Sequence, residues 1–306
     1  MGYIIPVIAI PVMFVASFLG SATPGLIAKA NPSIEMSKTL LYFAFAGAGA
    51  GAVSAVGFIH TFPEGNESFE AAVEDGVLPE YPWGGLVAAL GALLSVAMER
   101  VTLSFMSSFK RQHHHHHQTS QADENEPLTA SLKRLHPETS KADENESLRQ
   151  VLLEVCILLF GLALHSLFVG ITVGVAENDW VLLVAVVFHQ LFEGYALGAA
   201  MVKAKITSVG LLSLFDLLYA ISTPAGVAVG LVVRVSVGTD SPSYAIIEGV
   251  FQTLSAGILI YLGLCHLLVE DLDHIHQIRP TRAAYSTYIV GLTVGFVVLA
   301  VVALWA

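Results

Sequence analysis

The chain has 306 residues, of which 55% are hydrophobic and only 13% are charged, and its mean hydropathy is +0.69. Soluble domains carry about 25% charged residues, so this composition excludes an ordinary soluble protein and predicts one embedded in a lipid bilayer. The net charge of −11 argues against nucleic acid as a partner.

Several apolar stretches are long enough to cross a bilayer, which takes about 20 residues. The first lacks the basic start of a signal peptide and is too long to be one, so we expect it to be a span. The sequence therefore predicts an all-α, polytopic membrane protein with eight transmembrane helices. They cover approximately residues 4–28, 39–60, 83–105, 151–176, 180–202, 206–233, 244–268 and 284–305.

The stretch between the second and third spans, about 61–82, is predicted to be an exposed loop. It is acidic and contains no basic residue. A solvated loop is one interpretation; the functional interpretation is that its charge concentrates cations near the mouth of a pathway. Its acidic residues are Glu64, Glu67, Glu70, Glu74, Asp75 and Glu80.

Segment 106–149 is hydrophilic and biased in composition, so we expect a disordered loop that divides the chain. Residues 1–105 then hold spans one to three, and residues 150–306 hold spans four to eight with the metal site. The loop contains a histidine run that favours metal buffering, although low-complexity drift or an inserted purification tag would also explain it. The run is His113, His114, His115, His116 and His117.

Basic residues lie almost entirely in or beside the loops after spans one, three, five and seven. The positive-inside rule assigns these loops to the cytosol, which puts both termini on the non-cytosolic side. Only Arg234 lies in the other set of loops. The first set holds Lys29, Lys38, Arg100, Lys110, Arg111, Lys133, Arg134, Lys141, Arg149, Lys203, Lys205, Arg279 and Arg282.

Two histidines lie in the middle of spans four and five. At 1.5 Å per residue, His165 and His189 are both about 13–18 Å into a core of ~30 Å, so they can share one depth. Glu193 lies one turn after His189 on the same face, with Gln190 beside them. Such groups are costly in a bilayer unless compensated, and a divalent transition metal would compensate them. Hydrogen bonding between helices is the structural alternative.

Polar groups on either side of these histidines are candidates for a pathway. His60 lies at the outer end of span two. Glu154 is three turns from His165 on the same face, and Asp216 is two turns from Thr223. Charged groups inside a membrane usually have a function, although Glu154 is close enough to a helix end to reach the interface.

The hexapeptides HSLFVG and HQLFEG carry a family resemblance. They resemble the fourth- and fifth-helix signatures of the ZIP (Zrt/Irt-like) divalent metal transporters, and the similarity covers nearly the whole chain outside 106–149. The family's sixth helix is broken, and we expect Pro224 to break span six here. The matching segments are 165–170, 189–194, 58–64 at the end of the second helix, 222–226 in the sixth and 256–261 in the seventh.

The resemblance implies a homodimer of chains in a 3+2+3 helix arrangement, with spans one to three and six to eight as inverted repeats. It implies no resident cofactor, because the metal is the cargo. Histidine and glutamate would be direct ligands, and serine and glutamine weaker, neutral ones. The transport site would be lined by His165, Ser166, His189, Gln190 and Glu193.

Two positions depart from the two-metal pattern of some relatives. Val169 and Thr223 stand where those relatives carry glutamates. Because both bridging carboxylates are absent, we expect one metal ion in the core rather than two, bound more weakly and released sooner.

The leading hypothesis is uptake of a divalent transition metal into the cytosol across the plasma membrane, with an organelle membrane as the alternative. Zinc, ferrous iron or manganese would suit nitrogen and oxygen ligands, whereas magnesium and calcium prefer oxygen alone. One alternative is an intramembrane zinc hydrolase, but the sequence contains no HExxH motif. Another is a metal-sensing receptor without flux. We therefore expect a transporter and not an enzyme.

Overall fold

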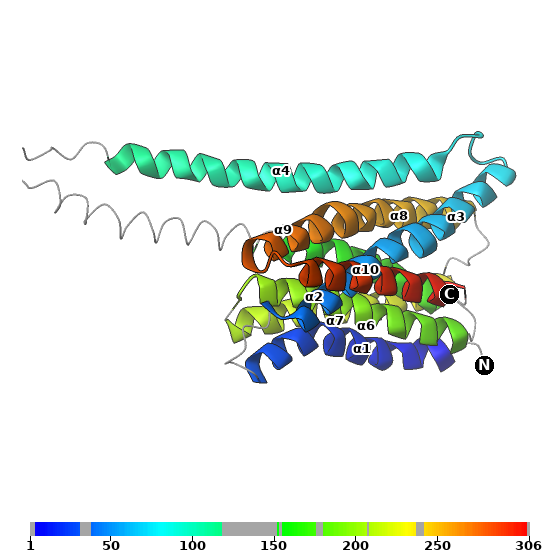
Figure 1. Ribbon diagram of the computed structural model, residues 1–306. Coiled ribbons are helices and arrows are strands. Elements are labelled where there is room, and N and C mark those ends of the chain that lie inside the picture. The colour runs from blue at the N-terminus through cyan, green and yellow to red at the C-terminus, as the bar shows by residue number, and fades with distance from the viewer. Residues whose placement is uncertain are drawn as a thin grey trace, which may run out of the picture.

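The computed structural model describes residues 4–30, 38–117, 152, 155–175, 180–206, 208–236 and 242–304, and its regular elements are all helices (Figure 1). Eight helices in this part of the chain are long and apolar enough to cross a membrane, which confirms the predicted class. One of them, Val155–Val175, is called the 155–175 helix below. The others are built from α1 (Ile4–Ala30), α2 (Leu40–Ala55), η2 (Val56–Thr61), α3 (Phe62–Glu74), α4 (Trp83–His117), α6 (Trp180–Lys203), α7 (Val209–Ser236), α8 (Pro242–Tyr261), η3 (Leu262–Leu267), α9 (Leu268–Ile278) and α10 (Arg282–Val302).

The second and seventh spans are longer than predicted. Helix α2 continues through the π-helical segment η2 into α3, and α8 continues through η3 into α9. The prediction of a loop over 61–82 is therefore wrong for most of its length. Helix α3 forms because Gly65, Phe69 and Ala72 recur at helical spacing and are buried, and α3 packs against α8.

Helix α4 is also longer than its predicted span. It continues to His117 and extends past the other helices (Figure 1). The first part of segment 106–149 is thus helical and not disordered. The sequence from Val101 to His117 contains no glycine or proline, so nothing in it ends the helix. The rest of that segment lies outside the described residues.

Helix α7 passes through Pro224 without the predicted break. A proline inside a helix removes one backbone hydrogen bond, and neighbouring hydroxyl groups can satisfy carbonyls that are freed in this way. The carbonyl that loses its donor is that of Ala220, four residues earlier, and beside it Ser222 Oγ donates a hydrogen bond of 2.6 Å to the carbonyl oxygen of Tyr219. The helix is continuous through the proline.

The helices form two bundles. In the first bundle, α1 packs against α6 and α7, and the 155–175 helix approaches α7 at glycines: a Cβ added at Gly170 would lie 2.9 Å from the Cα of Gly226. In the second bundle, α2 packs against α10, and α8 packs against α3 and α4. Small residues of this kind let membrane helices approach closely. Helices α3 and α9 lie at opposite ends of the assembly (Figure 1), which are called the α3 end and the α9 end below.

The interface between the bundles is packed differently at its two ends. Toward the α9 end, buried apolar side chains from both bundles form one cluster, the apolar seam. Toward the α3 end, a cavity of about 270 Å³ lies between the 155–175 helix, α7 and α8. The interface is therefore closed more tightly at the α9 end. The seam includes Ala50, Val53, Leu158, Leu162, Leu197, Ala200, Met201, Leu259 and Leu262.

We predict that Gly174→Ala destabilises the first bundle. A Cβ at this position would lie 2.9 Å from the Cα of Gly230, and that backbone contact cannot relax cheaply. Overpacking of this kind costs about 1–3 kcal/mol, which should lower the midpoint of thermal unfolding of the purified protein in detergent. Gly25→Ala in α1 is the matched control, because its Cβ would meet no atom within 4 Å. Equal midpoints for the two variants would contradict this account of the helix contact.

Candidate functional site

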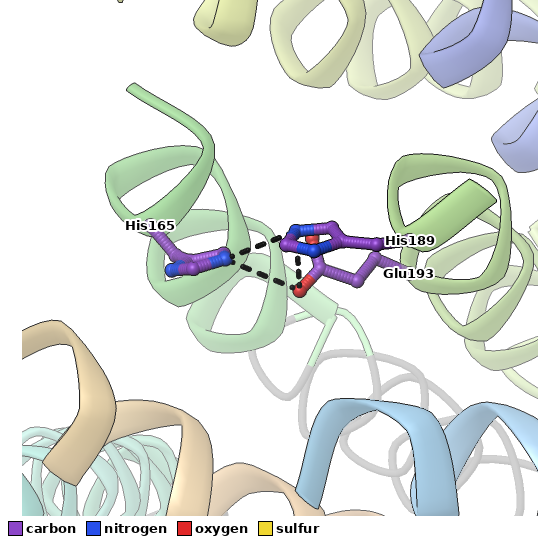
Figure 2. A group of neighbouring side chains, drawn as sticks. All are labelled: His165, His189 and Glu193. Carbon is purple, nitrogen blue, oxygen red and sulfur yellow. Dashed lines mark hydrogen bonds and ion pairs between the residues drawn. The ribbon is translucent and has the colours of Figure 1, made fainter. Parts of the chain in front are cut away.

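Three side chains from two helices converge at the centre of the first bundle. His165 comes from the 155–175 helix, and His189 and Glu193 come from α6 (Figure 2). The two histidine Nε2 atoms are 3.3 Å apart. Glu193 Oε1 lies 3.5 Å from His165 Nε2 and 3.8 Å from His189 Nε2. The matched depth predicted from the sequence is confirmed for the two histidines.

These spacings suit a small divalent cation. Four-coordinate zinc has ligand bonds of about 2.0–2.2 Å, so two ligands at corners of a tetrahedron are about 3.3–3.6 Å apart. The three atoms at the site are 3.3, 3.5 and 3.8 Å apart, so two of the separations match such a tetrahedron and the third is slightly longer. Two imidazole nitrogens and one carboxylate oxygen also form a donor set that zinc accepts.

Burial makes this cluster costly without a cation. His165 and Glu193 are fully buried and His189 is 2% exposed. Neither carboxylate oxygen of Glu193 accepts a hydrogen bond within the described part of the chain. A buried carboxylate needs a positive partner, and a bound metal ion would supply one. Thr61 Oγ1, at 3.4 Å from His165 Nδ1, contacts the other ring nitrogen and helps to orient it.

The predicted neutral ligands form a polar network beside the histidines. Gln190 Nε2 donates hydrogen bonds to Ser166 Oγ at 3.0 Å and to Thr223 Oγ1 at 2.8 Å. The hydroxyl group of Tyr219, a residue not predicted from the sequence, donates a hydrogen bond of 3.1 Å to the main-chain carbonyl oxygen of Gln190. Gln190 Oε1 has no partner among the described residues. Ser166 and Gln190 thus hold each other in place, and their role as ligands remains a prediction.

The positions of the two missing carboxylates are filled in different ways. Val169 is 3% exposed and belongs to an apolar cluster within the first bundle. Thr223 is fully buried and accepts the hydrogen bond from Gln190. Neither position offers an anionic ligand, which is consistent with the expectation of one metal ion.

A chain of polar groups leads from the histidines toward the α3 end. The ring centroids of His60 and His189 are 5.4 Å apart. His60 Nδ1 lies 3.1 Å from Glu64 Oε1, and Gln252 Nε2 donates to Glu64 Oε2 at 3.1 Å. Sequence reasoning proposed His60 but missed Gln252 and Glu248, which accepts a hydrogen bond from Ser68. Glu248 is a carboxylate inside the seventh predicted span, and this unusual position could have indicated both residues from the sequence.

The remaining predicted residues are not part of the three-residue cluster. Asp216 on α7 is 7% exposed, and its Oδ1 has no partner within the described residues. Glu154 lies outside the described residues. The histidine run 113–117 ends α4, and the structure does not describe its side chains. The pathway and buffering roles of these residues therefore remain predictions.

Comparison with known proteins gives a consistent result along the whole chain. Residues 3–303 match the family model described as "ZIP Zinc transporter". The chain is 31% identical to "Zinc transporter 3" of Arabidopsis thaliana over 97% of this chain and 84% of that protein. It is 28% identical to "Zinc transporter 5" of Oryza sativa subsp. japonica, over 98% and 86% of the two chains. It is also 27% identical to "Zinc transporter 6, chloroplastic" of Arabidopsis thaliana, over 98% and 92%.

We predict that the core binds one zinc ion per chain. The test is zinc titration of purified protein in which the histidine run 113–117 is replaced by alanine. Loss of a residue that only orients a metal ligand lowers metal affinity by roughly 10–100-fold. His189→Ala removes a ligand itself, so it should lower the zinc affinity by more than this or abolish binding. His276→Ala is the matched control, since His276 is exposed on α9. Two equivalents that both depend on His189 would contradict the single-ion site.

Proposed function

The chain belongs to the ZIP zinc transporter family, and on that premise we propose that zinc crosses the membrane through the site formed by His165, His189 and Glu193. The observation that carries this proposal is the convergence of their three ligand atoms within 3.8 Å in a fully buried position. Ser166 and Gln190 would complete the coordination when the network between them opens. The chain acts as a transporter, with zinc as cargo in an integral, multi-pass membrane protein.

We propose that zinc reaches the site from the α3 end. This is supported by the polar chain through His60 and Glu64 and by the acidic residues of α3, which attract cations to that end. The apolar seam blocks the opposite side. Release then requires the two bundles to move relative to each other, in the alternating-access manner of transporters with repeated bundles. Thr223, Asp216 and Glu154 would line the later part of the path.

The proposed direction is uptake into the cytosol. It rests on the distribution of basic residues, which places the loops at the α9 end in the cytosol and both termini outside. Lys203 and Lys205 at the end of α6, and Arg279 and Arg282 beyond α9, belong to this set. We propose the plasma membrane as the location and a homodimer as the assembly, the latter on the family resemblance alone.

Zinc is the proposed main substrate, with ferrous iron and manganese as weaker competitors at the same donor set. The hydrolase alternative needs an open water position and a general base beside the metal. Glu193 is the carboxylate nearest to the two histidines, and as a ligand it would not be free to act as that base. The receptor alternative lacks a supporting observation.

We predict that His189→Ala and Glu193→Gln each abolish uptake of labelled zinc in cells that express the chain. Each removes one of three ligand groups, and the remaining two cannot hold the ion in a buried site. His276→Ala, an exposed substitution of the same kind, should leave uptake unchanged at equal surface expression. Excess iron and manganese in the same assay would rank the metals.

Wild-type uptake no higher than that of empty cells, despite correct surface display, would refute the proposed transport. Uptake that persists in both site variants would refute the proposed site and leave transport by another route. Reconstitution in vesicles of known orientation, with a zinc-sensitive dye inside, separates uptake from export.

A further inference from the structure

The α9 end of the interface contains an ion pair between the two bundles. Lys203 is the last residue of α6, and its Nζ lies 2.9 Å from Glu270 Oε2 and 3.0 Å from Asp271 Oδ1 on α9. The side chains of Lys203 and Asp271 are 11% and 8% exposed. Exposed ion pairs contribute little, but breaking a pair that is largely removed from water is costly. This contact therefore affects whether the bundles stay together at this end.

The same sequence pattern occurs once at each end of the interface. Gly-x-x-His-x-x-x-Glu begins at Gly57 in η2 and again at Gly263 in η3. The histidine Nδ1 lies 3.1 Å from the glutamate Oε1 in the first copy and 3.2 Å in the second, which is the pair His266 and Glu270. Segments of π-helix are rare and often mark functional sites. The two copies are therefore equivalent features at opposite ends of the path.

The glutamates of the two copies have different partners. Glu64, in the first copy, accepts a hydrogen bond from the neutral amide of Gln252. Glu270, in the second copy, binds the ammonium group of Lys203. The carboxylate at the α3 end thus contacts an amide and an imidazole, whereas the carboxylate at the α9 end already binds an ammonium group that the protein supplies.

Lys203 lies just beyond the apolar seam, on the side away from the metal centre. The α6 part of the seam runs from Ala196 to Met201, on the α9 side of Glu193. One more polar contact ties α6 to the second bundle there, a hydrogen bond of 3.2 Å from the Tyr42 hydroxyl to the Ala199 carbonyl. For an ion to leave by the α9 end, the side chains of this seam must move apart. That movement also separates α6 from α9.

We propose that Lys203 is a latch residue, whose ion pair with Glu270 and Asp271 holds the α9 end of the interface closed and breaks each time the bundles separate to release zinc. The proposal rests on the alternating access proposed above. It predicts that loss of the ammonium group shifts the protein toward the state that is open at the α9 end.

The test is the rate at which a reporter thiol in the seam reacts with a membrane-impermeant maleimide supplied from the α9 end. The full chain would carry Cys156→Ser and Cys265→Ser, which remove its two cysteines, and the reporter Ala200→Cys. Lys203→Met should raise the rate about five- to tenfold, the size of a modest coupling between two states. Lys29→Met, the same change on an exposed residue at the end of α1, should not alter it.

Two further variants separate a latch from a general loss of packing. Asp271→Asn should also raise the labelling rate, because it weakens the same pair. Lys203→Arg should stay near the wild-type rate, because a guanidinium group can bind both carboxylates. An unchanged rate in folded Lys203→Met, or an equal rise in Lys203→Arg, would overturn the proposal.

A cross-link provides an independent test if Lys203→Met does not fold. Lys203→Cys and Glu270→Cys, joined by a short, cleavable thiol reagent, should stop most zinc uptake until the reagent is cleaved. Full uptake by completely cross-linked protein would overturn the latch. The labelling ratios need no zinc flux, so a failure of the proposed transport would appear separately, as absent uptake by the wild type.

Discussion

Glu193 is a carboxylate that makes no hydrogen bond within the described residues and is fully buried between helices that cross a membrane. Such a group is stable only beside a positive charge, and much of the fold serves to bring that charge to it. Helix α6 supplies His189 one turn away, and the 155–175 helix supplies His165 at the same depth. Glycine contacts within the first bundle hold α6 close to α1, where a Cβ at Gly194 would lie 3.0 Å from the Ser17 carbonyl oxygen, and hold the 155–175 helix close to α7 at Gly170. The metal centre and the close helix packing thus depend on each other.

The interface between the bundles gives this centre a direction. Polar side chains continue from His60 to Glu64 on one side, and apolar side chains from both bundles meet on the other. A cation moves readily along carboxylates and amides, whereas an apolar seam presents no ligand to it. The seam must therefore open as a whole, because packed side chains repack between discrete arrangements more easily than they deform. A buried ion pair at the edge of such a seam is well placed to control that step.

The sequence predicted the eight spans and the three converging side chains because both follow from local rules. Span length depends on composition, and the depth of His165 and His189 depends on residue counts from the span ends. The sequence analysis missed features that depend on distant contacts. Phe69 lies in a helix and not in an acidic loop because that helix packs against α8, and α7 continues through Pro224, where the local rule predicts a break. Lys203 was counted only as a basic residue of a loop, because its partners lie 67 and 68 residues away.

The replacement of two carboxylates by Val169 and Thr223 has a consequence for charge. A divalent ion bound to one carboxylate and neutral ligands leaves the site with a net charge of +1, whereas two carboxylates would neutralise it. A net charge in apolar surroundings is costly, so the loaded site is less stable than a neutral one would be. Gln190, which is held by Ser166 and Thr223, offers only a dipole to offset it. We therefore expect lower affinity for the ion at this centre and faster release once the seam on the α9 side has opened.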